Sequence, residues 1–500
     1  MRPGNSHNGA HSGGRPRFMS ASQDILSDTT DVSGGVDVRL TAAEPRLRAH
    51  DHTRRLLTGP FGAMLARPWL DAATLKVLKR GYFPLSRLWA AASAADGSVE
   101  AFWAFSGQPR RHEQTGRVED ILARFAEADV TSTATDAAWE RVFFGPDETR
   151  QSTRVALETA RHNRRDILNK QRRLFLPLLS RRTPRVRLAI DTPDEIATVY
   201  DPNRDTDDLF APPATMPPVQ VSHPVAGVAS TDQWLRFPSP SSRVGGTCWA
   251  RVHTPDGVVC PPTVILGHGV CVDFDHWHGL IDETQALLAQ GIRVIRPEAP
   301  WHGRRAPLGY FGGERAIGTF PSGMLDLFVA AIREWAVLAD WARNTSSGPL
   351  AVGGTSLGAL TAQLCASVAH DWPERLRPEA LYLMTHSGTM SEAMVTGAVS
   401  TLFADPAAVL ARGWAPATMR RQMSIIDPVH PPVMPPSRIV SVLGTRDVIT
   451  PFDGGETLVW RWAIPDGNMF VSKHGHFTIP MSLVRDPSPT RRFGEILNSL

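Results

Sequence analysis

A serine between two glycines is the sequence feature that most constrains the fold of this chain. Gly354, Ser356 and Gly358 form the motif. An apolar, strand-like segment, Pro349–Val352, precedes it, and a helical pattern, Leu357–Val368, follows it. Strand, sharp turn and helix in this order are typical of a nucleophile elbow, in which the serine hydroxyl stands clear of a sheet. The alternative is a glycine-rich turn without a chemical role.

Strand-like and helical segments alternate over the C-terminal half of the chain. The strand-like segments are Trp249–His253, Thr263–Gly267, Arg293–Arg296, Leu350–Gly353, Ala380–Met384, Arg438–Leu443 and Met469–Ser472. Helical patterns between them include Leu280–Gln290, Met324–Ala342 and Leu357–Val368. Short apolar strands are expected where helices cover both faces of a sheet. The alternation therefore predicts an α/β fold with a doubly wound, mostly parallel sheet.

Composition divides the chain into four regions. Residues 1–35 hold too few apolar groups to offset the entropy cost of ordering, so a disordered segment is expected. Residues 36–200 show apolar residues at helical spacing and predict a mostly helical N-terminal region. Prolines are frequent in residues 201–229, which predicts a linker. Residues 230–500 are expected to form the catalytic domain.

Charge and hydrophobicity exclude several classes of protein. A net charge of +3 over 500 residues gives no reason to expect nucleic-acid binding. The basic stretch 150–187 lacks the interleaved aromatic residues of a stacking platform, so a solvated helix face is favoured over an RNA- or lipid-binding helix. No window approaches 18 consecutive apolar residues, and no signal peptide is visible. We therefore expect a cytoplasmic protein without stable membrane insertion, unless a start codon further upstream encodes an export signal.

An acid should follow the serine along the chain, with a histidine after it. Asp447 lies just after the strand-like segment Arg438–Leu443, and functional residues of open α/β sheets gather at that edge. We predict that it orients the histidine. Asp427 and Asp453 are weaker candidates, because neither directly follows a strand-like segment.

Two histidines follow the last strand-like segment and compete for the role of general base. His476 is preceded by Gly475, which permits a tight loop and favours this residue. His474 is the alternative base.

The loop after Thr263–Gly267 is expected to supply an oxyanion donor. Gly269 lets the backbone turn inward, which leaves the N–H of Val270 as one donor and that of Leu357 as the other. His268 in the same loop is expected mainly to hydrogen-bond backbone.

Taken together, these segments resemble the α/β-hydrolase superfamily. The resemblance is carried by His268-Gly269, by the elbow at Ser356, by Asp447 and by Gly475-His476. It covers residues 230–500 and implies an α/β-hydrolase fold that needs no cofactor. One turn departs from the arginine-glycine-histidine-glycine pattern of many relatives and reads Pro300-Trp301-His302-Gly303, so a relative's substrate does not transfer to this chain.

Candidates for the substrate pocket are His268, His302 and Arg304. Arg304 suits an acidic group of a substrate, with ion pairing as the alternative. A cluster of possible metal ligands follows the oxyanion loop and comprises Asp273, Asp275, His276 and His278. Its spacing matches no metal pattern that we recognise, so capping and pocket lining are favoured and no metal is expected.

Residues 388–436 lie where α/β-hydrolases insert caps, and they are rich in methionine and aromatic residues. Such segments form adaptable apolar pockets, but they also form ordinary core. The sequence thus predicts a helical cap over an apolar substrate, with plain core as the alternative.

The expected function is a serine hydrolase that cleaves a carboxylic ester or thioester of a small-molecule acyl substrate through an acyl-enzyme. An amidase, peptidase or acyltransferase would use the same triad. A non-catalytic binding or scaffold protein that retains the fold is the alternative from another class. The sequence indicates no oligomeric state.

Overall fold

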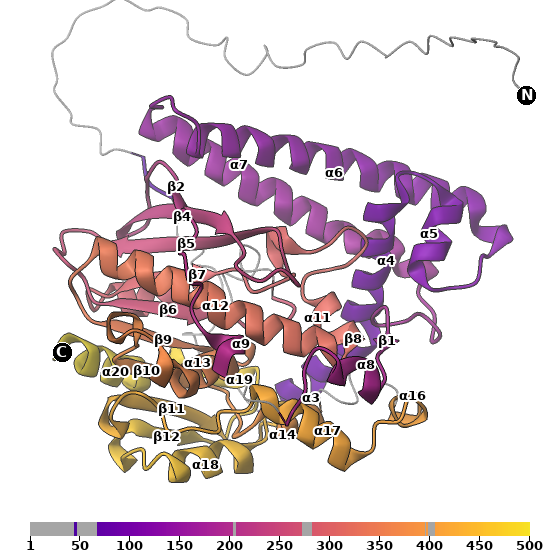
Figure 1. The fold of residues 1–500 in the computed structure, drawn as a ribbon. Helices are drawn as coiled ribbons and strands as arrows, with labels where there is room; N and C mark the ends of the chain where they lie inside the picture. Colours follow the sequence, from indigo (N-terminus) through magenta and orange to yellow (C-terminus); the bar gives the residue numbers. More distant parts are fainter. Residues whose placement is uncertain (1–44, 48–67, 204–206, 273–282, 396, 399–405) are drawn as a thin grey trace, which may run out of the picture. The chain divides into compact units, whose positions relative to one another are not determined.

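A ten-stranded sheet is the central element of the computed structural model (Figure 1). The structure describes residues 45–47, 68–203, 207–272, 283–395, 397–398 and 406–500. The strands of the sheet are β2 (Gln220–Val221), β3 (Val225–Ala226), β4 (Ser230–Pro238), β5 (Thr247–Pro255), β6 (Thr263–Gly267), β7 (Arg293–Pro297), β9 (Leu350–Thr355), β10 (Ala380–Met384), β11 (Ile439–Gly444) and β12 (Met469–Ser472). Their order is β12-β11-β10-β9-β6-β7-β5-β4-β2, and β3 also pairs with β4.

The strand directions confirm a mostly parallel, doubly wound sheet. All pairs from β7 through β6, β9, β10 and β11 to β12 are parallel. β5 is antiparallel to both β7 and β4, and β2 and β3 are antiparallel to β4. All seven strands predicted from the sequence are present, with ends that differ by at most two residues. The strands of this sheet that sequence reasoning missed, β2, β3 and β4, all lie at one edge.

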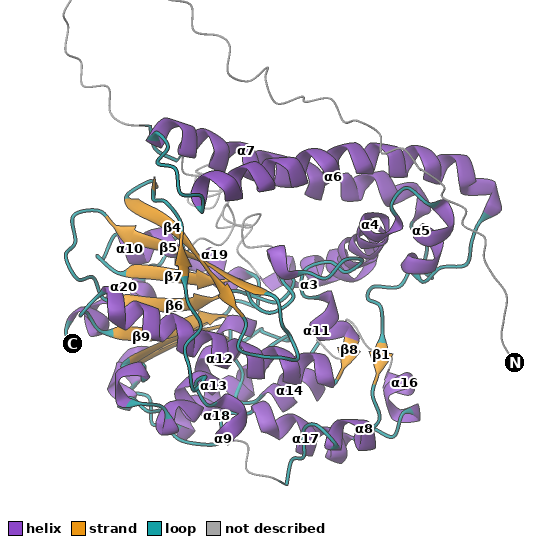
Figure 2. Cartoon of the chain, turned by 45° about the horizontal axis from the view of Figure 1, so that its top comes forward, coloured by secondary structure: helices purple, strands orange, loops and turns teal. Residues whose placement is uncertain are grey.

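Helices cover both faces of this sheet (Figure 2). From residue 193 onward, the described helices of the chain are α8 (Pro193–Ala197), α9 (Asp207–Phe210), α10 (Thr284–Leu288), α11 (Glu314–Gly318), α12 (Ser322–Thr345), α13 (Leu357–Val368), α14 (Met390–Val395), α16 (Pro406–Ala411), α17 (Pro416–Met423), α18 (Phe452–Arg461), α19 (Thr478–Leu483) and α20 (Ser488–Asn498). β1 (Ala189–Ile190) and β8 (Thr319–Phe320) form a separate parallel pair.

Alternate side chains of each central strand enter different parts of the core. In β6, Ile265 packs in the cluster that contains α12 and α13, whereas Val264 and Leu266 pack with α10 and α20. Side chains of a strand point alternately to the two faces, and here both faces are covered. This is why β6 reads as an unbroken apolar run in the sequence.

The N-terminal region is mostly helical over its described residues 68–200. Its helices are α3 (Pro68–Val77), α4 (Phe83–Ala95), α5 (Val99–Ser106), α6 (Thr115–Phe143) and α7 (Gln151–Lys170). α6 and α7 run side by side (Figures 1 and 2). Side chains of α4, α5 and α6 belong to the same apolar cluster as α12 and α13, so these helices share a core with the sheet. The predicted disordered segment, residues 1–35, lies outside the described residues.

Aromatic residues join α6 to the antiparallel edge of the sheet. Trp139 of α6 packs edge-on against Trp234 of β4, with ring centroids 5.1 Å apart. Arg161 of α7 lies over the Trp139 ring at 4.9 Å and pairs with Glu158. Arg161 is buried, so the expectation of a solvated face for the basic stretch is wrong at this residue. β2, β3 and α9 fall within residues 201–229, the segment that was predicted to be a linker.

Helices also occupy the predicted cap segment, 388–436, where α14, α16 and α17 lie. Trp414 is 1% exposed, donates its indole N–H to the Asp191 carbonyl at 2.7 Å and packs against Phe320. It is therefore a core residue. The backbone N–H of Ala398 donates to the Val448 carbonyl at 2.7 Å, which places this end of the segment beside the turn after β11.

None of the helices that the structure describes combines the length and the apolar character needed to cross a membrane.

Candidate active site

Ser356 lies at the turn from β9 into α13, in a backbone conformation that favours glycine. Its φ is +56° and its ψ is −117°. A non-glycine residue in such a region costs of order 1–3 kcal/mol and persists only where the surroundings impose it. The surroundings here include hydrogen bonds from the Ser356 N–H to the Met384 carbonyl, at 3.0 Å, and to the Thr385 hydroxyl, at 3.1 Å.

Close packing explains the glycines on either side of the serine. A Cβ on Gly354 would lie 2.5 Å from the carbonyl carbon of Gly358 and 2.6 Å from the carbonyl oxygen of Gly267. A Cβ on Gly358 would overlap the backbone of Gly267. The end of β6, the elbow and the start of α13 therefore meet backbone to backbone. This geometry requires the glycine spacing seen in the sequence.

A chain of two short contacts joins Ser356, His476 and Asp447. The Nε2 atom of His476 lies 2.8 Å from the Ser356 Oγ, and its Nδ1 lies 2.8 Å from the Asp447 Oδ2. With the proton on Nδ1, the ring donates to the carboxylate and its Nε2 accepts from the serine hydroxyl. Each of the three residues is less than 9% exposed.

The Asp447 carboxylate is held by the turn that follows it. Its Oδ1 accepts the N–H groups of Ile449 and Thr450, both at 2.9 Å. The Thr450 Oγ1 lies 2.8 Å from the Asp447 Oδ2 and 3.2 Å from the His476 Nδ1. Sequence reasoning missed Thr450. An aspartate that bonds the backbone two and three residues on is a common turn pattern and is the signal that could have drawn attention to it.

The rival acids have other partners. Asp427 accepts the N–H groups of Met390 and Ser391, and burial raises its pKa to about 6. It thus caps the start of α14. Asp453 is exposed in the first turn of α18.

The rival base, His474, differs from His476 in its surroundings. Burial lowers the pKa of His474, against an opposing attraction from Asp71. Its Nδ1 atom is buried without a hydrogen-bond partner. The contact with Ser356 is made by His476.

The predicted oxyanion loop lies beside the serine. A Cβ on Gly269 would be 3.8 Å from the Ser356 Cβ, so the loop backbone passes directly next to Ser356. Val270 follows in this loop. Leu357 is the first residue of α13, and the first N–H groups of a helix have no carbonyl within the helix to bond.

Two histidines fasten this loop to the turn after β7. The His268 Nδ1 lies 2.7 Å from the Gly269 carbonyl, and its Nε2 accepts the Ala299 N–H at 3.1 Å. The His302 Nε2 accepts the Cys271 N–H at 3.0 Å, and its Nδ1 lies 2.9 Å from the Pro300 carbonyl.

His302 was predicted as a residue of the substrate pocket, and in the structure it contacts backbone groups. The side chain is fully buried, and both ring nitrogens are bonded to backbone. Burial lowers the pKa of His302 to about 3, so the ring is neutral near pH 7. Its place in the structure is behind the oxyanion loop, as a support for the loop backbone.

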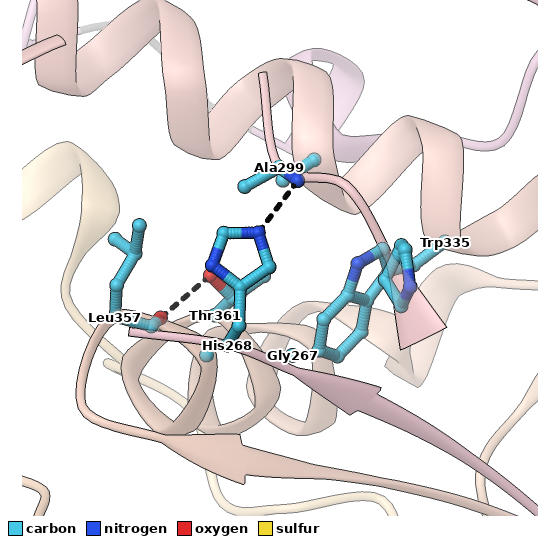
Figure 3. Close-up of a pocket in the computed structure, with 9 residues that line it drawn as sticks. Gly267, His268, Ala299, Trp335, Leu357 and Thr361 are labelled. Atoms are coloured by element: carbon cyan, nitrogen blue, oxygen red, sulfur yellow. Dashed lines mark hydrogen bonds between the residues drawn. The ribbon is translucent and has the colours of Figure 1, made fainter. Parts of the chain in front are cut away.

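A small cavity of about 10 Å³ lies behind the elbow (Figure 3). It is lined by Gly267, His268, Pro297, Ala299, Ala331, Trp335, Leu357, Gly358 and Thr361. Figure 3 shows the His268 ring bonded to Ala299 on one side of it. The volume suffices for about one water molecule, so this cavity cannot take an acyl chain.

Arg304 was predicted as a pocket residue, with ion pairing as the alternative, and the structure shows it in ion pairs. Its guanidinium pairs with Asp136 at 3.1 Å and Glu140 at 3.3 Å, both on α6, and lies over the Trp139 ring. These ion pairs and the stacking on Trp139 join α6 to the turn after β7.

The possible metal ligands at positions 273–278 lie outside the described residues. Within the described ranges, the structure shows no group of three or more His, Cys, Asp or Glu side chains that could hold a metal ion.

One family model matches part of the C-terminal half of this chain. The family described as Alpha/beta hydrolase domain containing 18 matches residues 264–401. No curated protein matches the sequence.

Solved structures that resemble the chain include a lipase in its open form, at 17% identity, which aligns over 54% of this chain and 98% of its own with a TM-score of 0.37. A cold-adapted esterase from an Arctic intertidal metagenomic library shows 15% identity, 55% and 97% coverage and a TM-score of 0.37. Acetyl xylan esterase 1 from Thermoanaerobacterium sp. shows 14% identity, 59% and 94% coverage and a TM-score of 0.41. Likenesses this distant carry no conclusion about activity.

The matched segment begins in β6 and includes the oxyanion loop, the elbow and β10. Asp447 and His476 lie beyond it. The strand order and the elbow geometry agree with the family match. Residues 264–401 thus match the α/β-hydrolase superfamily, and the sheet of the C-terminal region has the corresponding fold.

Proposed function

We propose that the chain is a serine hydrolase that cleaves a carboxylic ester or thioester of a small acyl compound. The observation that carries the proposal is the pair of 2.8 Å contacts through which His476 joins Ser356 to Asp447. A serine hydroxyl is a weak nucleophile until a base takes its proton, and a neutral imidazole at this distance is such a base. Three buried side chains from different loops meet here in the order that acyl-transfer chemistry needs.

In the first half of the proposed reaction, the Ser356 Oγ bonds to the substrate carbonyl carbon while its proton passes to the His476 Nε2. The carbonyl π electrons move to oxygen, beside the N–H groups of Val270 and Leu357. When the tetrahedral intermediate collapses, the bond to the leaving alcohol or thiol breaks, and the protonated His476 returns the proton to that group. Asp447 stabilises the imidazolium throughout.

In the second half, His476 takes a proton from water, and the hydroxide bonds to the acyl carbon. Collapse breaks the bond to the Ser356 Oγ, which regains its proton, and the free acid leaves. Two oriented backbone N–H groups at an oxyanion contribute a rate factor on the order of 10²–10³ each. Amide cleavage or acyl transfer to another acceptor would use the same atoms, and the ester or thioester is favoured as the least demanding of these substrates.

Reaction with a fluorophosphonate probe tests the proposal. The wild-type chain should be labelled at one serine and should hydrolyse p-nitrophenyl esters with a burst, whereas Ser356→Ala should do neither. Ser367→Ala is a matched control, because Ser367 is buried on the same helix and bonds the His430 carbonyl, away from the triad. If the folded wild-type chain neither labels nor hydrolyses, the alternative of a non-catalytic binding protein replaces the proposal.

A further inference from the structure

A carboxylate from the N-terminal helices reaches the loop that carries His476. Asp71 lies on α3, which packs against α19 (Figures 1 and 2). Its Oδ1 accepts the Phe477 N–H at 2.7 Å and the Thr478 N–H at 3.3 Å. Its Oδ2 accepts the Thr478 hydroxyl at 2.6 Å. These groups directly follow His476, although Asp71 lies about 400 residues earlier in the chain.

The same carboxylate occupies the space beneath Gly475. A Cβ on Gly475 would lie 2.5 Å from the Asp71 Cγ and 2.8 Å from both carboxylate oxygens. The Gly475 N–H in turn donates to the Thr478 hydroxyl oxygen at 3.0 Å. Gly475 does not have a positive φ, so the expected reason for this glycine, conformational freedom, is replaced by a steric one. The loop from Gly475 to Thr478 is folded around Asp71.

Because these hydrogen bonds are buried, removing their acceptor would lower the stability of the loop. Asp71 is 6% exposed, and Gly475 and Thr478 are buried. Without the carboxylate, the Phe477 and Thr478 N–H groups lose their acceptor in a place with little access to water. The loop would then shift to find other partners. Because the His476 ring is attached to it, the ring would shift as well.

We propose that Asp71 is a positioning residue for His476, so that the N-terminal helices are part of the catalytic apparatus of the C-terminal fold. The catalytic consequence rests on the proposed function. Displacing a reacting group by about 1 Å costs on the order of 10²-fold in rate. A carboxylate that only stabilised the fold would leave the rate of each correctly folded molecule unchanged.

The test compares Asp71→Ala, Asp71→Asn and Glu158→Ala. Glu158 is a matched control, because it is also a buried carboxylate on an N-terminal helix. It accepts a hydrogen bond from Arg251 of β5, and among the described residues it has no hydrogen bond to the loop of His476. The measurements are the rate constant and the final extent of Ser356 labelling by a fluorophosphonate. A lower extent reports fewer folded molecules, whereas a lower rate constant reports a displaced base.

We expect Asp71→Ala to lower the labelling rate constant roughly 10-fold or more. Asp71→Asn should stay within a few-fold of wild type, since its amide oxygen still accepts the Phe477 N–H. Glu158→Ala should lower the extent or the melting temperature at an unchanged rate constant. An Asp71→Ala rate constant equal to that of wild type overturns the proposal.

A second variant covers the case in which Asp71→Ala does not fold. Gly475→Ala pushes a methyl group against the carboxylate and should slow labelling in the wild-type background. Asp71→Asn/Gly475→Ala should be as slow or slower, since the amide fills the same space. A Gly475→Ala variant that labels at the wild-type rate contradicts the packing argument.

Hydrogen exchange separates this proposal from the proposed function. If the wild-type chain does not react with the probe, the hydrolase proposal fails. The exchange rates of the Phe477 and Thr478 amide protons still measure whether Asp71 holds the loop. These protons should exchange faster in Asp71→Ala than in Glu158→Ala. Equal exchange in the two variants would show that Asp71 does not hold this loop.

Discussion

At the scale of single residues, the sequence indicates the candidate triad but not the residues that surround it. Ser356 was expected from its glycines, and Asp447 and His476 from their places after strands. Thr450 and Asp71 were not expected, because their contacts with this site are hydrogen bonds that only the folded chain creates. Asp71 in particular lies on a helix with no motif, and nothing near it in the sequence points to His476.

The choice between the two histidines leads to a direct prediction. His476→Ala and Asp447→Asn should each lower kcat/KM for a p-nitrophenyl ester on the order of 10³-fold or more, because the triad acts as a unit. His474→Ala should be much milder, since the contact with Ser356 is made by His476. An inactive His474→Ala beside an active His476→Ala would reverse the assignment.

His302 allows a prediction about the oxyanion loop. His302→Ala removes the acceptor of the Cys271 N–H, one residue after Val270. The loop should lose its alignment, which lowers kcat by roughly 10- to 10²-fold with little change in KM. His253→Ala is the control, because His253 of β5 is also buried but pairs with Asp232 of β4, at the antiparallel edge of the sheet. Steady-state kinetics of both variants, compared at equal folded fraction, decide whether the loss is specific to His302.

At the scale of elements, prediction from sequence succeeded in the middle of the sheet and failed at its edge. β6, β10 and β12 have the predicted bounds. Strands that are covered on both faces read as short apolar runs, which are easy to recognise in the sequence. β4 was missed because its buried and exposed positions alternate, with Asp232 among the buried ones, so its apolar signal is weak. The ion-pair partners of that aspartate, Arg251 and His253, lie on the next strand, β5.

The helices of segment 388–436 give a prediction about acyl-chain length. This segment bonds the turn after Asp447 through Ala398, so a cap formed by it would border the acyl site. An apolar pocket there should raise kcat/KM from acetyl to butyryl and hexanoyl esters, by up to ~0.8 kcal/mol per buried methylene. A series of p-nitrophenyl esters measures this, and a flat or falling series refutes the cap.

Two variants locate the pocket within that segment. Met394 of α14 is partly buried, and Met394→Ala should change the chain-length preference if the cap lines the acyl site. Trp414→Ala serves as the control. Trp414 is packed in the core, so its removal should lower stability by roughly 3–5 kcal/mol and leave the preference unchanged.

At the scale of the whole molecule, the N-terminal helices and the sheet form one structure. Glu44–Leu500 is a single compact unit. A buried ion pair between Arg87 of α4 and Glu314 of α11 adds to the shared apolar core. Composition alone suggested that the helical region and the sheet are separate, because prolines are frequent between them. Proline content marks places where regular structure stops, but it does not reveal which surfaces pack together.

Buried neutral histidines make the stability of this whole unit depend on pH. Burial lowers the pKa of His302 to about 3 and that of His386 to about 4, whereas an unfolded histidine titrates near 6.5. Above pH 6.5 both states are neutral at these positions. As the pH falls from about 6.5 towards 4, the unfolded chain binds protons that the folded chain does not, so the free energy of unfolding decreases. Each histidine contributes a slope of up to about 1.4 kcal/mol per pH unit in this window.

Urea unfolding measured from pH 8 to pH 4 tests this dependence. In wild type, the free energy of unfolding should decline below about pH 6.5. His302→Gln has no titrating ring, so it should be less stable than wild type at pH 8, where the lost loop contacts dominate, yet show a shallower decline on acidification. The two stability curves should therefore converge as the pH falls. Parallel curves would mean that His302 gains a proton equally easily in the folded and unfolded chains, and would contradict its burial as a neutral support of the oxyanion loop.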